Sequence, residues 1–255
     1  ILSSATLPSQ PLKPQKWMVY GAGLAGWFVI AFFMLGIGYL AFNKITGVQE
    51  VERLTDIPVL GMIPNYTVEK IQHARVVVET EIHSAVGEAF RILRTNMQFV
   101  MPGETSRVIS ISSTVSGEGK TFIGINLAAI FAKSGKKVLM IDLDLRKPKL
   151  NRVFGHRQDH HGVSTILIGK ESPEDCIMRT DIDHLDILLS GPIPPNPSEL
   201  IMSVAMDSLF ADLRKQYDLI FIDTPPIGIV TDGTLVMKKA DIQTFIPPVK
   251  NQEKL

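Results

Sequence analysis

The stretch Arg107–Gly135, RVISISSTVSGEGKTFIGINLAAIFAKSG, decides the fold of this chain. Its first apolar run predicts a buried strand over Val108–Ser112, and a loop of small residues follows. A helix is then expected to begin near Lys120. A strand, a small-residue loop and a helix in this order are typical of folds that bind phosphate groups.

The end of this loop, GEGKT (117–121), has the composition of a phosphate-binding turn. Glycines let backbone N–H groups surround a phosphate oxygen, the lysine reaches the β- and γ-phosphates, and the threonine hydroxyl binds Mg²⁺. The helix directs its positive dipole end at the same anion. Thr114 stands where G-x-x-x-x-G-K-[ST] has its first glycine, so an ordinary strand–turn–helix is the competing interpretation. The expected nucleotide-binding residues are Ser116, Gly117, Glu118, Gly119, Lys120, Thr121 and Phe122.

Carboxylates follow two further apolar runs of the sequence. The run Val138–Ile141 ends in DLD (142–144), and the run Leu219–Ile222 ends in Asp223 and a Thr-Pro-Pro turn. Uninterrupted apolar runs are expected of parallel strands covered on both faces, and such sheets bind ligands at the carboxyl ends of their strands. The sequence therefore predicts a site for ATP and Mg²⁺. The expected metal ligands are Thr121, Asp142 and Asp223.

Together these elements predict an α/β fold of the P-loop NTPase type, with a mostly parallel sheet and helices on both faces. The segment HGVSTILIGK (161–170) suggests a turn of helix, and Leu185–Gly191 another inner strand. A proline-rich loop follows. The next helix is expected to begin at Asn196 or Ser198 and to continue through Phe210.

Composition narrows the possible partners and cofactors. The 26 lysines and arginines balance 26 aspartates and glutamates, so no nucleic-acid partner is expected. The only cysteine, Cys176, excludes a disulfide framework within the chain and suits a reducing compartment. His156, His160 and His161 are close in sequence. Because no carboxylate or cysteine has suitable spacing to them, they are not expected to bind metal.

The N-terminal part of the chain predicts one transmembrane helix. Residues 1–16 are rich in Pro, Ser and Gln and indicate an extended linker. Residues 17–42 contain no charged side chain, and a helix of that length exceeds the roughly 30 Å hydrocarbon core of a bilayer. Trp17, Tyr20 and Tyr39 near its ends suit the membrane interfaces. Its length and lack of a polar face argue against the alternatives, a signal peptide and a buried core helix.

The remaining boundaries follow from these assignments. We expect residues 43–80 to form a cytoplasmic connector, residues 81–246 the nucleotide-binding domain, and residues 247–255 a short tail. Basic residues flank both ends of the span and do not decide its orientation. Because ATP is cytosolic, the residues after the span are expected inside and Ile1 outside. The absence of an initiator methionine suggests the C-terminal part of a longer protein.

The segment Ser84–Val100, SAVGEAFRILRTNMQFV, predicts an amphipathic helix. Its apolar stripe, at spacings of four, three and four, consists of Val86, Phe90, Leu93 and Met97. A neighbouring face carries Glu88, Arg91 and Arg94. Spacing alone favours a solvated charged face with weak ion pairs inside the helix.

Four stretches of the chain resemble one family, the bacterial tyrosine kinases fused to polysaccharide co-polymerases. They are the loop SSTVSGEGKT (112–121), the strand VLMIDLDLRKPKL (138–150), FIDTPP (221–226) and the helix EAFRILRTN (88–96). The helix is similar to the family's ExxRxxR oligomerisation motif. The span and the proline-rich loop are also similar to parts of the family. The resemblance covers nearly everything from about Leu7 to Ile246.

The resemblance implies an ATP- and Mg-dependent protein-tyrosine kinase domain over residues 81–246 that phosphorylates its own chain. Lys120 and Thr121 would bind the phosphates and Mg²⁺. Asp142 and Asp144 would bind metal and activate the tyrosine hydroxyl, and Asp223 would complete the metal site. The implied catalytic residues are Lys120, Asp142 and Asp144. This chemistry is mostly positioning and charge neutralisation.

The resemblance also implies partners. Glu88, Arg91 and Arg94 would bridge neighbouring domains into a ring, so that the tail of one subunit enters the site of the next. Further implied partners are the membrane, the machinery for polysaccharide polymerisation and export, and a phosphotyrosine phosphatase. The implied location is the bacterial inner membrane, and the implied role is control of capsular or exopolysaccharide export and chain length.

Two departures from the family pattern concern the C-terminal end. The family usually ends in a tyrosine-rich tail, whereas the tyrosines here are Tyr20, Tyr39, Tyr66 and Tyr217, and the helix expected after Ile246 is missing. We therefore expect a truncated end. Two alternatives stay open: a non-catalytic, nucleotide-sensing scaffold for polysaccharide export, and a membrane-tethered partition-type ATPase. The latter class has a signature lysine where this chain has Val115.

Overall fold

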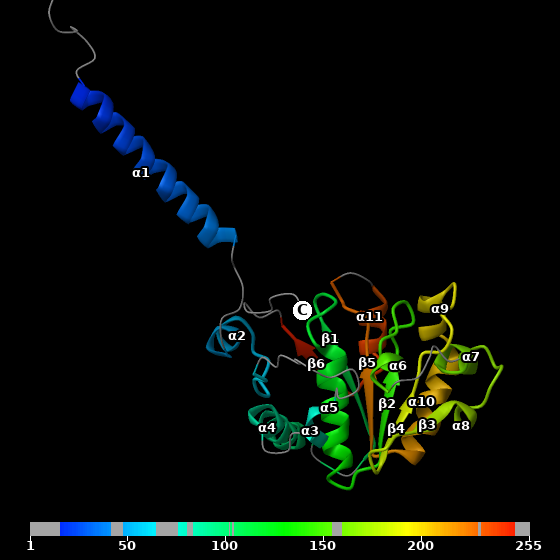
Figure 1. Cartoon of the computed structure of the whole chain (residues 1–255). Coiled ribbons are helices and arrows are strands. Elements are labelled where there is room, and N and C mark those ends of the chain that lie inside the picture. The colour runs from blue at the N-terminus through cyan, green and yellow to red at the C-terminus, as the bar shows by residue number, and fades with distance from the viewer. Residues whose placement is uncertain are drawn as a thin grey trace, which may run out of the picture. The chain divides into compact units, whose positions relative to one another are not determined.

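The structure is a computed structural model that forms two compact units, Ile1–Lys44 and Ile45–Leu255 (Figure 1). The residues that it describes are 16–41, 48–64, 76–80, 84–101, 103, 105–154, 160–228 and 231–247. The predicted linker except Lys16, the predicted tail except Pro247, His156 and Tyr66 therefore lie outside the described residues.

The described residues of the N-terminal unit form the helix α1 (Lys16–Ala41), whose ends lie within one residue of the predicted span. Its segment Lys16–Gly38 is long and apolar enough to cross a membrane, and none of its most apolar window is buried in protein. Large apolar side chains point outward all round it, as Phe32 and Met34 do. A helix without a polar face requires an apolar surrounding, so these features support membrane anchoring.

The second unit is built on a six-stranded sheet in the order β3-β4-β2-β5-β1-β6. The strands are β1 (Arg107–Ser113), β2 (Val138–Asp142), β3 (Ile177–Arg179), β4 (Leu185–Leu188), β5 (Leu219–Asp223) and β6 (Ile242–Ile246). Only β3 is antiparallel to its neighbour, and all other pairs are parallel. The predicted α/β class with a mostly parallel sheet is confirmed.

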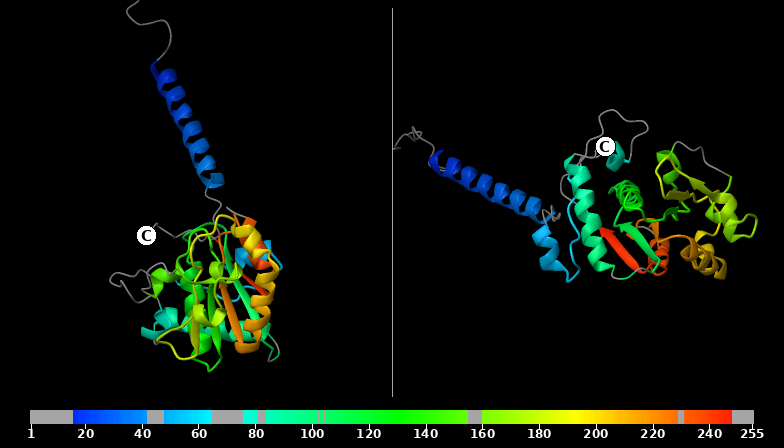
Figure 2. Two further views of the ribbon diagram at one scale, coloured as in Figure 1. Left: turned by 90° about the vertical axis from the view of Figure 1, so that its right-hand side faces the viewer. Right: turned by 90° about the horizontal axis from the view of Figure 1, so that it is seen from below.

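Helices cover both faces of this sheet (Figures 1 and 2). The helices of this unit are α2 (Val48–Leu54), α3 (Val77–Thr80), α4 (Ala85–Val100), α5 (Lys120–Ala132), α6 (Leu150–Val153), α7 (Val163–Leu167), α8 (Pro173–Cys176), α9 (Pro197–Ile201), α10 (Val204–Gln216) and α11 (Thr231–Met237), of which α2 buries none of its residues. Successive strand side chains point to opposite faces, so Phe221 packs with the α4 and α5 side while Ile220 and Ile222 pack with the α10 side. This is why the predicted strands are apolar throughout.

The helix α4 has the predicted amphipathic pattern. Ser84 caps its start, because its Oγ accepts a hydrogen bond of 3.0 Å from the Gly87 N–H. All four residues of the predicted apolar stripe are buried. The ring of Phe90 meets that of Phe122 on α5 with centroids 6.0 Å apart, so the stripe fixes α4 against the helix that follows the phosphate loop.

The prediction of one helix running through Phe210 is wrong. The chain forms α9 and α10, with Ser203 between them in an extended conformation. The Ser203 Oγ accepts a hydrogen bond from the Met206 N–H at 3.3 Å and starts the second helix. A serine that caps a new helix competes with continuation of the preceding one, and the sequence analysis did not weigh this signal.

Candidate nucleotide-binding site

The loop between β1 and α5 has the backbone conformation that its glycines allow. Gly117 and Gly119 have φ angles of +100° and +88°, in the left-handed region that favours glycine. Glu118 is buried, and its Oε2 accepts a hydrogen bond of 3.0 Å from the Val115 N–H. The loop is therefore closed on itself before α5 begins at Lys120, as the sequence predicts.

Thr114 fits the position of the missing first glycine because its backbone has no positive φ. The Thr114 carbonyl accepts a hydrogen bond of 3.0 Å from the Gly228 N–H in the loop after β5. A Cβ on Gly228 would lie 2.5 Å from that carbonyl oxygen, so the two loops approach closely only because residue 228 is glycine. The contact therefore requires glycine at position 228, in the loop after β5, and not at position 114.

The strands β2 and β5 are parallel neighbours that place Asp142 and Asp223 side by side in register. Thr121 at the start of α5 donates a hydrogen bond of 2.5 Å from its Oγ1 to Oδ2 of Asp223. Lys120 is buried next to them, and its charge acts on Asp223. The three expected metal ligands and the expected phosphate-binding lysine thus meet at the carboxyl edge of the sheet.

The buried carboxylates of this cluster have too little positive charge near them to favour their ionised forms. Burial and then the charge of Asp223 raise the pKa of Asp142 to about 8, against backbone hydrogen bonds from Leu150 and Asp144. Burial also raises the pKa of Asp223 to about 6, although Thr121 and Lys120 oppose this. Carboxylates buried together disfavour their charged forms, and a bound cation would reverse this balance.

Asp144 does not continue the strand, which ends at Asp142. The Asp144 N–H donates to Oδ1 of Asp142 at 3.1 Å, and Oδ1 of Asp144 accepts from the Lys147 N–H at 3.0 Å. The DLD segment is therefore a turn held by its own carboxylates. Asp144 is buried and stays near the other two carboxylates, since its charge also raises their pKa values.

Two other expected nucleotide-binding residues, Ser116 and Phe122, differ in their exposure to solvent. Ser116 is exposed at the crest of the loop. Phe122 turns its ring toward Phe90 in the core, so any contact of Phe122 with a nucleotide would come from its backbone.

A second set of contacts, which the sequence analysis missed, fixes the loop after β2. Arg146 donates from Nε to Oδ2 of Asp232 at 2.5 Å, and Ser198 donates from Oγ to Oδ1 of the same side chain at 2.5 Å. Asp232 is buried. Burial opposes its charge, but these two donors hold its pKa below the ordinary value. The only sequence signal was the arginine of the DxDxR segment, which says nothing about where its partner lies.

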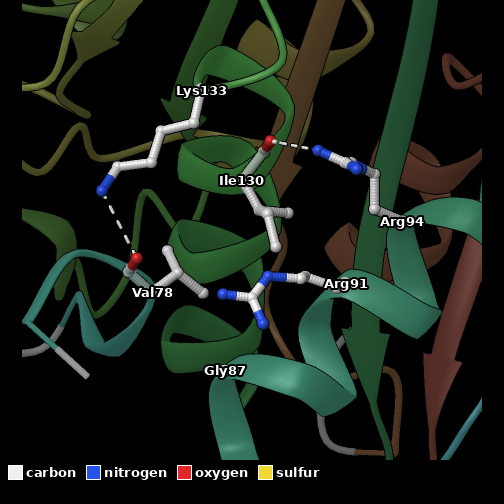
Figure 3. A pocket seen from close by; sticks show the side chains of 6 residues that line it. All are labelled: Val78, Gly87, Arg91, Arg94, Ile130 and Lys133. Atoms are coloured by element: carbon white, nitrogen blue, oxygen red, sulfur yellow. Dashed lines mark hydrogen bonds between the residues drawn. The ribbon is translucent and has the colours of Figure 1, made fainter. Parts of the chain in front are cut away.

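Two residues of the expected oligomerisation motif, Arg91 and Arg94, line a pocket between α3, α4 and α5 (Figure 3). Its volume is about 200 Å³, and it is lined by Val78, Gly87, Arg91, Arg94, Ile130 and Lys133. Glu88 forms an ion pair with Arg91 inside α4. Arg94 points its Nη1 at the Ile130 carbonyl, 3.5 Å away at the end of α5. The pairing predicted from spacing is therefore present for Glu88 and Arg91, whereas Arg94 faces the next helix.

The histidines require one correction. Glu171 is a carboxylate partner for His161 that the sequence analysis did not find, and its side chain also accepts hydrogen bonds from Thr165 and from the Cys176 thiol. Burial, and then Glu171, raises the pKa of that thiol to about 11, so it is an unreactive packing group at neutral pH.

Comparison with known proteins agrees with this geometry. A family model described as an AAA domain matches residues 106–247. The tyrosine-protein kinase YwqD of Bacillus subtilis is 40% identical over 166 residues, which are 65% of this chain and 70% of the relative. The putative tyrosine-protein kinase EpsB of Ralstonia nicotianae is 32% identical over 250 residues, or 94% of this chain. The chain spans only 33% of the length of that longer relative.

Solved structures give the same result for the fold. The kinase domain of the Escherichia coli tyrosine kinase ETK is similar with a TM-score of 0.72 and 29% identity, over 78% of this chain and 80% of that one. The chimerical protein CapA2B2 is similar with a TM-score of 0.72 and 36% identity, over 80% and 87% of the two chains. Taken with the phosphate loop and the carboxylates at the ends of β2 and β5, these similarities show that the chain belongs to the family of bacterial tyrosine-protein kinases.

Proposed function

We propose that this chain is an ATP- and Mg-dependent protein-tyrosine kinase that phosphorylates its own kind and regulates capsular or exopolysaccharide polymerisation and export. Relatives named as tyrosine-protein kinases support the activity, and one of them, from Klebsiella pneumoniae, is named as a putative tyrosine-protein kinase in cps region. The observation that carries the proposal is the meeting of Lys120, Thr121, Asp142 and Asp223 at one edge of the sheet.

The residues at this edge fit a hydrated magnesium ion. Thr121 Oγ1 and Asp223 Oδ2 already share one hydrogen bond, and the buried Oδ1 of Asp223 has no hydrogen-bond partner among the described residues. Hard oxygen ligands of this kind are what Mg²⁺ prefers. When bound, the ion neutralises charge on the β- and γ-phosphates. Thr121, Asp142 and Asp223 would hold it, directly or through water.

The phosphate groups would be held by the loop between β1 and α5. The Gly117 and Gly119 backbone and the first turn of α5 supply N–H donors, and the buried ammonium of Lys120 supplies the charge. Phosphoryl transfer depends mainly on such positioning. Ser116 belongs to the same loop and is exposed.

The tyrosine hydroxyl requires a group that takes its proton. Asp142 and Asp144 are the carboxylates available for this at the end of β2, and both are buried. Asp144 is held by the Lys147 N–H, which fixes its direction. We assign proton acceptance to this pair of carboxylates.

Assembly and location form a further part of the proposal. Glu88, Arg91 and Arg94 would join neighbouring subunits into a ring through α4, whose Arg91 and Arg94 line the pocket of Figure 3. The helix α1 would cross the inner membrane with Ile1 outside and the kinase domain in the cytoplasm. A phosphotyrosine phosphatase would reverse the modification. The chain would work fused to, or together with, a polysaccharide co-polymerase and the export machinery.

The test is phosphate transfer by the full chain purified in detergent, given Mg-ATP and an added tyrosine peptide. We expect phosphotyrosine on the peptide by mass spectrometry, its loss in Lys120→Met, and its retention in the exposed control Lys170→Met. ATP hydrolysis without phosphotyrosine would favour a partition-type ATPase. Nucleotide binding without either reaction would favour a non-catalytic scaffold. Unchanged transfer in Lys120→Met would place the active site elsewhere.

A further inference from the structure

A lysine outside the phosphate loop reaches back to it. Lys149 lies just before α6, in the segment after β2, and its Nζ is 2.8 Å from the Ser116 Oγ. Ser116 is at the exposed crest of the loop, next to Val115, whose side chain is 45% exposed and carries no charge. The ammonium of Lys149 therefore lies over the part of the loop that has no cation of its own.

The backbone of Lys149 is fixed by the proposed metal site. Its N–H donates a hydrogen bond of 3.1 Å to Oδ2 of Asp142, and the next N–H, from Leu150, donates to the same oxygen at 3.1 Å. Asp142 is fully buried at the end of β2. Because two hydrogen bonds hold this backbone, only the side-chain torsions of Lys149 remain to be ordered when its ammonium meets a ligand.

The charge of Lys149 also acts on the metal-site carboxylates. Burial raises the pKa of Asp223, whereas the positive charges of Lys120 and then Lys149 oppose that rise. The Lys149 ammonium is therefore close enough to influence both the loop crest and the end of β5. A nucleotide whose phosphates lie between Thr121 and Ser116 would pass within reach of it.

We propose that Lys149 is a phosphate-binding residue that donates, within its own subunit, a hydrogen bond to the terminal phosphate of the nucleotide bound on this loop. The inference rests on the nucleotide site of the proposed function and adds a residue to it. Lys120 binds the phosphates from the start of α5, and Lys149 binds them from the segment before α6. The two ammonium groups come from different elements, so they contact the anion from two directions.

This assignment has a specific consequence for the nucleotide preference. A charge-assisted hydrogen bond to a phosphate changes a binding constant by roughly tenfold or more. Because Lys149 contacts the terminal phosphate in this assignment, it should strengthen the binding of ATP and have little effect on the binding of ADP. A lysine that served only to neutralise the buried carboxylates would instead change protein stability and leave the ATP-to-ADP ratio unchanged.

The experiment is a titration of fluorescent ATP and ADP analogues, with Mg²⁺, into the full chain in detergent. We expect Lys149→Met to weaken the binding of the ATP analogue about tenfold and that of the ADP analogue less than threefold. Lys149→Arg should recover part of the lost affinity. The control Lys136→Met removes an exposed lysine before β2 and should match the unmodified chain. Melting curves by circular dichroism would accompany each variant to show that it is folded.

The outcomes separate this inference from the kinase proposal. ATP binding by Lys149→Met equal to that of Lys136→Met would overturn the inference, as would equal weakening of ATP and ADP. If the unmodified chain binds nucleotide with the expected Lys149 effect but forms no phosphotyrosine, the kinase proposal fails and the Lys149 assignment stands. If the unmodified chain binds no Mg-nucleotide, both fail.

Discussion

The hydroxyl of Thr121 and the carboxylate of Asp223 are joined by a hydrogen bond of 2.5 Å, although 102 positions separate them in the chain. It connects the first turn of α5 to the end of β5. Since β1 lies beside β5 in the sheet, the contact closes the phosphate loop over the ends of two neighbouring strands. The same two oxygens are suitable ligands for Mg²⁺.

The first prediction concerns this hydroxyl. Thr121→Val keeps the shape of the side chain but removes the donor, which leaves Asp223 without its closest partner and the metal without a ligand. We expect Mg-ATP binding to weaken by about tenfold or more, measured by titration with a fluorescent analogue. Thr121→Ser retains the hydroxyl and should bind nearly as the unmodified chain. Equal affinities for the valine and serine variants would remove Thr121 from the site.

The second prediction concerns pH. The pKa of Asp142 is raised from its ordinary 3.8 to about 8, so the folded chain without metal holds a proton there that the unfolded chain has released. Stability due to this group is therefore complete below about pH 4 and decreases as the pH rises toward 8. The measurement is the melting temperature across this range without Mg²⁺. Asp142→Asn should flatten that dependence, and a slope that the variant leaves unchanged would contradict the assignment.

The same shift predicts the pH dependence of magnesium binding. A metal ligand must be deprotonated, so the affinity for Mg²⁺ should increase as the pH rises through about 8. Titration of Mg²⁺ at several pH values, with nucleotide fixed, measures it. An affinity independent of pH between 6 and 9 would show that Asp142 is ionised throughout or does not bind the metal.

The third prediction concerns the buried Asp232. Its replacement in Asp232→Ala removes the acceptor of both Arg146 and Ser198, so we expect a loss of about 2 kcal/mol in the free energy of unfolding. The loss is moderate because Arg146 is partly exposed and regains water. Asp212→Ala is the control, since it breaks only an exposed pair with Lys215 and should cost under about 0.5 kcal/mol. Urea unfolding followed by circular dichroism measures both, and equal losses would contradict the account.

The fourth prediction concerns the charged face of α4. Glu88→Ala breaks an exposed ion pair with Arg91, which should change stability by less than about 0.5 kcal/mol. If this face joins subunits, the same change combined with Arg91→Ala should reduce the oligomer mass measured by light scattering in detergent. Gln98→Ala, exposed on the same helix, is the matched control. A mass that stays the same in the double variant would exclude this face as the interface.

The parallel sheet and the proximity of Asp142 to Asp223 could be predicted from the sequence. Strands that are buried on both faces appear in the sequence as continuous apolar runs. The runs ending in Asp142 and Asp223 determine where parallel strands end, and ligands gather at that edge. The buried stripe of α4 could also be predicted, because apolar residues with a period of about 3.6 mark the buried side of a helix.

The contacts made by loops could not be predicted in this way. Gly228 supports Thr114, and Lys149 reaches Ser116, because the segments between strands fold back onto the phosphate loop. Such contacts depend on the path of a loop, which has no periodic pattern. The break between α9 and α10 was missed for a local reason, since the capping side chain of Ser203 starts a new helix where continuation was expected.

The most direct test of the central claim is the effect of Mg²⁺ on nucleotide affinity in Asp142→Asn and Asp223→Asn. For the unmodified chain, we predict that saturating Mg²⁺ tightens binding of a fluorescent ATP analogue about tenfold or more, and that neither variant shows this tightening. A variant that still gains affinity from Mg²⁺ as the unmodified chain does would contradict a magnesium ion held at the ends of β2 and β5.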